Sequence, residues 1–193
     1  SLWGLEPSWL ELIAVLLAFA MIVCTIVERH WGWPLAAISS VLYFFLFWSQ
    51  RLYGDALLQL VFVALALWGW SLWLRGEEGA PLPVTRIPKR QWVTLAWVGT
   101  LIWLVTGSML INFTDTDVPW WDAFPSAFSL IGQYLLAHKR LENWAVWIVV
   151  NGVAAGLFAW KALWLTTLLY LVFIALSVVG WRRWAKHIEV TAL

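Results

Sequence analysis

The nine residues LLQLVFVAL at positions 57–65 return almost unchanged as LLYLVFIAL at positions 168–176, with seven of the nine identical. The same offset of 111 residues aligns tryptophans elsewhere in the chain without a gap: Trp9 with Trp120, Trp33 with Trp144, Trp70 with Trp181 and Trp73 with Trp184. Apolar segments often match leucine to leucine by chance, but they seldom match tryptophan to tryptophan repeatedly in one register. The sequence therefore predicts an internal duplication.

The composition places most of this chain in lipid. Its 193 residues are 63% hydrophobic and 12% charged, and their mean hydropathy is +0.79. Soluble domains carry about 25% charged residues. The net charge of +1, without a basic cluster, argues against nucleic-acid binding. The single cysteine, Cys24, and three scattered histidines argue against a metal site. We expect a membrane protein with no metal, cofactor or nucleic-acid partner.

Seven apolar stretches are each close to the roughly 20 residues that a helix needs to cross a bilayer. They cover residues 9–27, 32–49, 55–75, 91–111, 119–138, 143–160 and 162–181. These stretches are too long and too continuously apolar for barrel strands, which alternate in polarity over about 10 residues. The first stretch follows no cleavage pattern, so we expect a retained span and not a signal peptide. The predicted fold is an all-α integral membrane protein with seven transmembrane helices.

The offset of 111 residues corresponds to four spans, so each repeat contains three spans and one span is left as a connector. We expect a first three-helix repeat over residues 1–75, a cytoplasmic linker over 76–90, a connector helix over 91–111 and a second repeat over 112–193. A shift of four spans preserves direction across the membrane, so the two repeats run parallel. This 3+1+3 order resembles the layout of the SWEET sugar transporters.

The distribution of positive charge predicts the orientation of the chain. With seven spans, one side of the membrane holds ten of the twelve Lys and Arg residues: Arg29, Arg75, Arg86, Lys89, Arg90, Lys139, Arg140, Arg182, Arg183 and Lys186. The other side holds only Arg51 and Lys161. Because cytoplasmic loops carry the excess of Lys and Arg, we expect the N-terminus outside and the C-terminus in the cytoplasm.

Three stretches resemble one family in particular. Residues 33–73 contain LYGDALLQ, the sixth span opens with Trp144-x-x-Trp147-x-x-x-Asn151, and residues 169–184 read LYLVFIALSVVGWRRW. Together they resemble the PnuC family of bacterial vitamin transporters over nearly the whole chain. The resemblance implies a full-length SWEET-like fold in the bacterial cytoplasmic (inner) membrane. It also implies facilitated diffusion of nicotinamide riboside by alternating access, without ATPase activity or ion coupling. The vitamin would then be trapped by a cytoplasmic riboside kinase. A homo-oligomer, such as a trimer, is implied as well.

The motif of the sixth span could form a substrate site. Trp144, Trp147 and Asn151 are spaced i, i+3 and i+7, so they share one helix face. Indoles can stack on a flat cationic heterocycle, a contact worth about 0.5–2 kcal/mol, and Asn151 could bind a ribose hydroxyl. Alternatively, the two tryptophans belong to an interfacial belt or to helix packing, and Asn151 bonds a neighbouring helix.

Two further candidates follow from the duplication. The offset pairs Gln59 of the third span with Tyr170 of the seventh, and Ser40 of the second span with Asn151. An amide complements a carboxamide because each offers a donor and an acceptor. The family places a glutamine at the position of Gln59 for this role. Gln59 could instead make an interhelical hydrogen bond, Tyr170 could pack with a satisfied hydroxyl, and Ser40 could bond its own helix.

The fifth span carries a polar stripe, Asp122, Ser126, Ser129 and Gln133, with a spacing close to i, i+4, i+7 and i+11. Such a stripe on an apolar helix faces inward, so Ser129 and Gln133 are predicted to line a pathway. Asp122 lies near the outer end, where it could draw cations to an entrance or simply favour the helix N-terminus. Pro125 could act as a hinge or produce a static kink.

Other functions fit this sequence less well, and other substrates stay open. A retinal protein needs a lysine deep in the last span, whereas the four lysines lie at loops or span ends. An intramembrane enzyme needs an acid dyad or a nucleophile and its base at one depth, and none is evident. A passive scaffold leaves the polar stripe unexplained. Relatives of the same fold carry thiamine or riboflavin, so these vitamins stay as alternatives to nicotinamide riboside.

Overall fold

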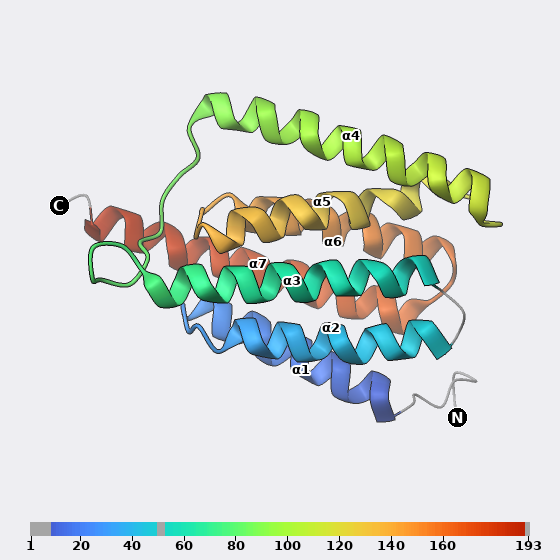
Figure 1. The fold of residues 1–193 in the computed structure, drawn as a ribbon, viewed down its shortest axis with the longest axis horizontal. Coiled ribbons are helices and arrows are strands. Elements are labelled where there is room, and N and C mark those ends of the chain that lie inside the picture. Colours follow the sequence, from blue (N-terminus) through green and yellow to red (C-terminus); the bar gives the residue numbers. More distant parts are fainter. Residues whose placement is uncertain (1–8, 50–52, 192–193) are drawn as a thin grey trace. The chain divides into compact units, whose positions relative to one another are not determined.

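The structure is a computed structural model that describes residues 9–49 and 53–191 of the chain. Within these residues it contains seven helices (Figure 1): α1 (Trp9–Ile26), α2 (Gly32–Ser49), α3 (Tyr53–Arg75), α4 (Lys89–Phe113), α5 (Pro119–Ala137), α6 (Asn143–Trp160) and α7 (Trp164–Thr191). The prediction of an all-α chain with seven helices is confirmed. The largest difference is at the C-terminus, where α7 continues about ten residues beyond the predicted span. Its charged end contains good helix formers, so the helix does not stop where the apolar segment stops.

Five of the helices are long and apolar enough to cross a membrane: α2, α3 from Asp55, α4, α6 and α7 from Thr166. The apolar part of α1, Val15–Ile26, is shorter. Helix α5 does not reach this hydropathy because the polar stripe and Pro125 lie within it. Such a helix can lie in a membrane because its neighbours cover it: α5 contacts both α4 and α6. Seven of its residues are buried in these contacts.

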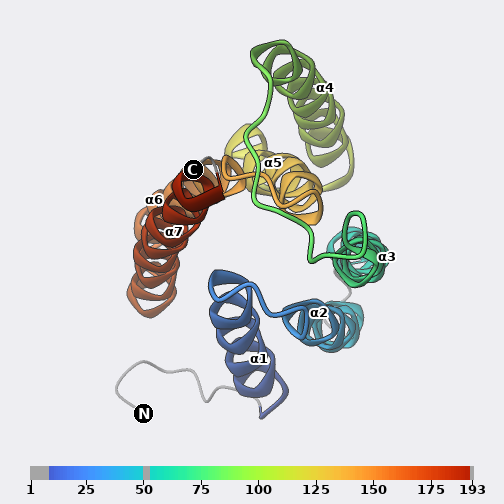
Figure 2. The ribbon, with the colours of Figure 1, turned by 90° about the vertical axis from the view of Figure 1, so that its left-hand side faces the viewer.

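The chain divides into two compact units, one within Ser1–Pro81 and the other within Leu82–Leu193. In the first unit, α2 packs against both α1 and α3. In the second unit, α4, α5, α6 and α7 each pack against the next helix along the chain. Figure 2, which looks nearly along the helices, shows α2 between α1 and α3, and α5 between α4 and α6. The helix expected to be a connector, α4, is therefore part of the second unit.

A tryptophan cluster joins α2 to α3 in the first unit. The rings of Trp33 and Trp73 meet edge to face with centroids 5.7 Å apart and planes at 80°. Gly69 lies beneath Trp33, because a Cβ atom at this glycine would come within 2.5 Å of the Trp33 ring. The absence of a side chain at position 69 thus lets the indole pack directly against the backbone of α3.

The second unit repeats this cluster between α6 and α7. Trp144 and Trp184 meet edge to face with centroids 5.3 Å apart and planes at 83°. A Cβ atom at Gly180 would come within 2.6 Å of the Trp144 ring. Each of these three residues is 111 positions after its counterpart in the first unit. The offset found in the sequence therefore also relates tertiary contacts, which supports the duplication.

Residues 82–88, the second half of the predicted linker, are tied to the turn between α5 and α6. We call them the linker strap. The backbone N–H of Thr85 donates to the Lys139 carbonyl at 3.2 Å, and that of Leu141 donates to the Thr85 carbonyl at 2.9 Å. The buried Lys139 donates to the Leu82 carbonyl at 2.8 Å. These bonds make the strap an ordered part of the second unit.

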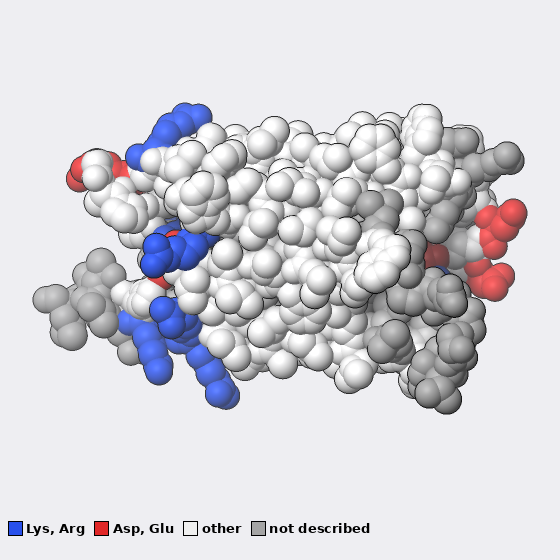
Figure 3. Space-filling model, turned by 90° about the horizontal axis from the view of Figure 1, so that it is seen from below, with Lys and Arg blue, Asp and Glu red and all other residues white. Residues whose placement is uncertain are grey.

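A buried carboxylate completes this attachment. Glu142, which is 8% exposed, accepts a hydrogen bond of 3.2 Å from the backbone N–H of Ile87. Arg140 adds a bond of 2.7 Å from its guanidinium to the Thr85 hydroxyl. Figure 3 shows a broad uncharged surface with Lys and Arg side chains beside it. This separation of charge is the pattern on which the predicted orientation rests.

Candidate functional site

Helix α6 carries the tryptophan motif and buries most of it. The side chain of Trp144 is 3% exposed and that of Asn151 is 8% exposed, while Trp147 is partly buried. At about 1.5 Å of rise per residue, Asn151 lies about 10 Å along the helix from Trp144. The motif therefore spans two turns on one side of α6, and two of its three members point into the protein.

The packing of Trp144 leaves its indole N–H without a partner. The ring lies against Gly180 and Trp184 of α7, and Nε1 is buried with no hydrogen-bond partner among the described residues. An indole N–H can only donate, and a buried donor without an acceptor costs about 1–3 kcal/mol. An acceptor supplied by a bound molecule would remove this cost.

Helix α5 supplies the neighbouring polar group. A Cβ atom at Gly132 would come within 2.9 Å of the Trp147 ring, so the glycine lets this indole lie on the α5 backbone. The next residue, Gln133, has a buried Oε1 atom with no hydrogen-bond partner in the described part of the chain. Trp147 therefore packs on α5 directly before the residue that carries this unpaired amide oxygen.

Ser129 lies one turn before Gln133 on α5. The contact between Gly132 and Trp147 sets the register of the two antiparallel helices, so Ser129 lies at about the depth of Asn151. Its hydroxyl, however, donates to the carbonyl of Pro125 in its own helix, as serines in membrane helices often do. Helix α5 runs from Pro119 to Ala137 with Pro125 inside it. The roles of Ser129 in the pathway and of Pro125 as a hinge stay predictions.

Asp122 lies at the start of α5 and is paired. Its Oδ1 atom is 3.3 Å from Nζ of Lys161 in the turn between α6 and α7, and its Oδ2 atom accepts a hydrogen bond from the Thr116 hydroxyl. The ion pair closes the end of the α5–α6 contact. The Lys161 ammonium compensates the negative charge of the Asp122 carboxylate. A role of Asp122 in drawing cations to an entrance stays a prediction.

Tyr170 belongs to an aromatic cluster on α7 and α6. Its ring centroid is 5.2 Å from that of Phe158 and 5.6 Å from that of Phe173. The remaining candidates lie in the first unit: Ser40 on α2 and Gln59 on α3 are both partly buried. The neighbour of Ser40, Ser39, is the more deeply buried of the two serines.

Sequence reasoning did not single out Asn143, the first residue of α6. Its side chain is fully buried, Nδ2 donates to the Arg140 carbonyl at 2.6 Å, and Oδ1 has no partner in the described region. The signal in the sequence was a polar residue directly before Trp144. Among the described residues, no three His, Cys, Asp or Glu side chains are grouped as a metal site would require.

Comparison with known proteins relates this geometry to one family. The family described as nicotinamide mononucleotide transporter matches residues 8–186. The fold is similar to that of a crystal structure of the vitamin B3 transporter PnuC, with a TM-score of 0.76 and 24% sequence identity. That similarity covers 94% of this chain and 83% of the other.

Curated relatives match over nearly the same length. The nicotinamide riboside transporter PnuC of Escherichia coli is 22% identical over 94% of this chain and 87% of its own. PnuC of Neisseria mucosa is 26% identical over 94% of this chain and 74% of its own. The riboflavin/roseoflavin transporter RibM of Streptomyces davaonensis is 25% identical over 91% of this chain and 84% of its own.

Proposed function

This chain belongs to the nicotinamide mononucleotide transporter family, and on that premise we propose that it carries nicotinamide riboside across the bacterial cytoplasmic membrane. It is a multi-pass membrane transporter of the PnuC family and not an enzyme. Transport is by facilitated diffusion with alternating access. A cytoplasmic kinase then phosphorylates the riboside and prevents its return, and the protein works as a homo-oligomer.

The observation that carries this proposal is the set of unused polar atoms beside the tryptophans of α6. Trp144 offers a buried donor and Gln133 a buried acceptor, each without a hydrogen-bond partner among the described residues. Gln133 directly follows Gly132, on which the ring of Trp147 lies. A pyridinium riboside has a flat cationic ring, a carboxamide with a donor and an acceptor, and ribose hydroxyls. The indole faces match the ring, and Gln133 and Asn151 match the polar groups.

Riboflavin is the second candidate, because the relative from Streptomyces davaonensis is a riboflavin/roseoflavin transporter. Its fused ring is also flat and carries donors and acceptors, so tryptophans and amides suit it as well. It is uncharged, however, and gains no cation–π attraction from the indoles. Thiamine is cationic like the riboside and is the third vitamin to compare. The net charge of the preferred ligand therefore separates riboflavin from the two cations, and a direct comparison of affinities separates the riboside from thiamine.

Calorimetric titration of the detergent-purified protein tests the proposal. Nicotinamide riboside should bind at micromolar concentration or below, and riboflavin and thiamine should bind more weakly or not at all. Asn151→Leu and Gln133→Leu should each weaken riboside binding about tenfold or more, as expected for losing a buried hydrogen bond to a ligand. Val149→Ala, on the exposed face of α6, is the matched control and should bind as the wild type does.

Two results would contradict parts of this proposal. Tighter binding of riboflavin or thiamine would replace the substrate and leave the site in place. Wild-type affinity for the riboside in both amide variants would show that α5 and α6 do not form the binding site.

A further inference from the structure

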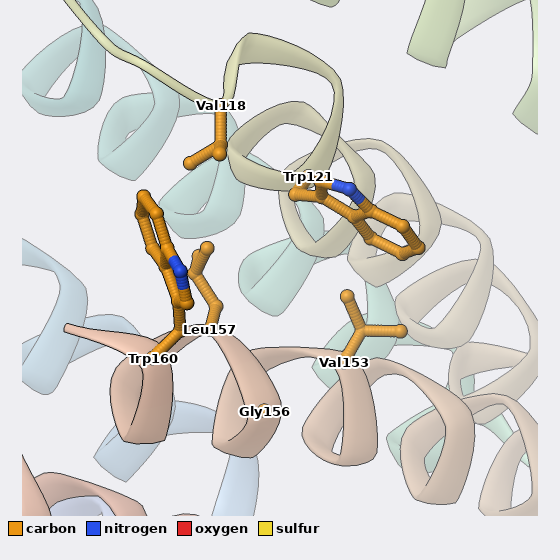
Figure 4. A pocket seen from close by; sticks show the side chains of 6 residues that line it. All are labelled: Val118, Trp121, Val153, Gly156, Leu157 and Trp160. Carbon is orange, nitrogen blue, oxygen red and sulfur yellow. The ribbon is translucent and has the colours of Figure 1, made fainter. Parts of the chain in front are cut away.

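A cavity of about 450 Å³ lies between the start of α5 and the end of α6 (Figure 4). Its lining is mostly apolar: Val118, Trp121, Val153, Gly156, Leu157 and Trp160. In Figure 4 the side chains of Trp121 and Trp160 approach the cavity from different sides, and Gly156 leaves space between them. Apart from the two indole N–H groups, this lining offers no polar side-chain atom, so it suits hydrocarbon better than a polar solute.

This cavity is separate from the candidate substrate site. At about 100° per residue, Gly156 lies about 140° around α6 from Asn151. Gly152 and Gly156 are both exposed, and Cβ atoms at these two positions would meet nothing within 4 Å. Trp160, on the same side, is also exposed. We take this open apolar face of the second unit to meet lipid, so that the cavity opens toward the bilayer.

The rim of the cavity carries both signs of charge. Trp121 is followed directly by Asp122, and Trp160 by Lys161, and these two charged residues form the ion pair at 3.3 Å. The side chains of Lys161 and Asp122 are 39% and 22% exposed, so both can still reach a further partner. Tryptophans concentrate at the level of lipid headgroups. The charged rim therefore lies where headgroups lie, and the apolar cavity extends from it toward the hydrocarbon.

We propose that this cavity binds an acyl chain of a phospholipid whose zwitterionic, amine-bearing headgroup rests on the Lys161–Asp122 pair. The phosphate accepts hydrogen bonds from the Lys161 ammonium. The headgroup ammonium donates to Asp122, and the exposed Asp117 in the preceding loop adds to the negative potential. A rim with both charges complements a headgroup with both charges better than a purely anionic one. A quaternary ammonium has no N–H to donate, so it fits less well.

The test uses the full chain, purified in detergent and stripped of lipid. Phosphatidylethanolamine, phosphatidylcholine and phosphatidylglycerol with identical acyl chains are added separately, and bound lipid is counted by native mass spectrometry alongside thermal unfolding. Phosphatidylethanolamine should remain bound and raise Tm by roughly 5–10 °C at about 100 times its Kd. The other two lipids should bind at least about tenfold more weakly.

Two matched variants locate the site. Gly156→Phe fills the cavity and should weaken phosphatidylethanolamine binding more than tenfold. Gly152→Phe, one turn away in equally open space but outside the lining, should leave it unchanged. Lys161→Gln should remove the preference for this lipid while the protein still folds.

Three outcomes would overturn the proposal. The first is equal binding of all three lipids, which would remove the role of the charged rim. The second is undiminished binding in Gly156→Phe, which would place the lipid elsewhere. The third is a changed oligomeric mass in Gly156→Phe with the lipid response intact, which would make a second copy of the chain the occupant.

Discussion

Trp144 is positioned by packing, and the packing leaves its polar edge unused. Gly180 and Trp184 hold the ring from α7, whereas the N–H group of the same ring is buried with no partner among residues 9–49 and 53–191. In the first unit, Trp33 is held in the same way by Gly69 and Trp73. Seven residues after this tryptophan, the second unit has Asn151, whereas the first unit has Ser40. The two units thus share a framework but differ in the polar group near it.

This difference gives a paired prediction at the residue scale. Gly180→Ala and Gly69→Ala should each lower the free energy of unfolding by about 1–3 kcal/mol, because the new methyl group overlaps a rigid indole ring. Gly180→Ala should also weaken riboside binding, since it displaces Trp144, whereas Gly69→Ala should leave the affinity close to that of the wild type. Thermal unfolding and calorimetric titration of the two variants measure both effects. Equal loss of affinity in the two variants would argue against a special role of Trp144.

At the scale of the elements, the linker strap is ordered although the sequence around it is typical of a loop. The stretch RGEEGAPLPVTRIPKR has the composition of a loop. Its second half is nevertheless fixed to the α5–α6 turn by backbone bonds, by Lys139 and by the carboxylate of Glu142. Any freedom of the linker is therefore confined to the residues before the strap.

A variant of Glu142 tests this attachment. Glu142→Ala should cost about 1–3 kcal/mol of stability, because the buried N–H of Ile87 loses its acceptor. It should also speed trypsin cleavage after Arg86, which lies in the exposed part of the strap. Glu142→Gln keeps an acceptor oxygen and serves as the control, with most of the stability and protease resistance retained. An unchanged cleavage rate in Glu142→Ala would show that the carboxylate does not hold the strap.

At the scale of the whole molecule, the distribution of Lys and Arg predicts an N-terminus outside the cell and a cytoplasmic C-terminus. In a background with Cys24 replaced by serine, single cysteines at Glu78 and Asp117 test this orientation. Both positions are exposed in loops. A membrane-impermeant maleimide should label Asp117→Cys in intact cells and should label Glu78→Cys only after permeabilisation. The reverse pattern would invert the proposed topology.

The sequence by itself determined the number of helices and nearly all of their bounds, because apolar runs of about 20 residues can only be helices in lipid. The duplication stays a prediction from the offset of 111 residues, which the two matching tryptophan clusters support. The sequence also identified Trp144, Trp147 and Asn151 as candidates, because their spacing and their resemblance to the family motif are local features of one helix. It also located α5, but it did not show that this more polar helix is covered by α4 and α6.

Only the tertiary structure decided which polar atoms the packing leaves free. Ser129 and Gln133 look alike in the sequence stripe, yet the hydroxyl of Ser129 bonds its own helix, while Oε1 of Gln133 is buried and meets no partner in the part of the chain that the structure describes. The apolar cavity beside Gly156 and the attachment of the linker strap likewise arise from residues distant in sequence. The physical reason is that the hydropathy of each segment alone decides whether it forms a helix in lipid. The pairing of buried polar atoms and the presence of cavities depend instead on how neighbouring helices pack.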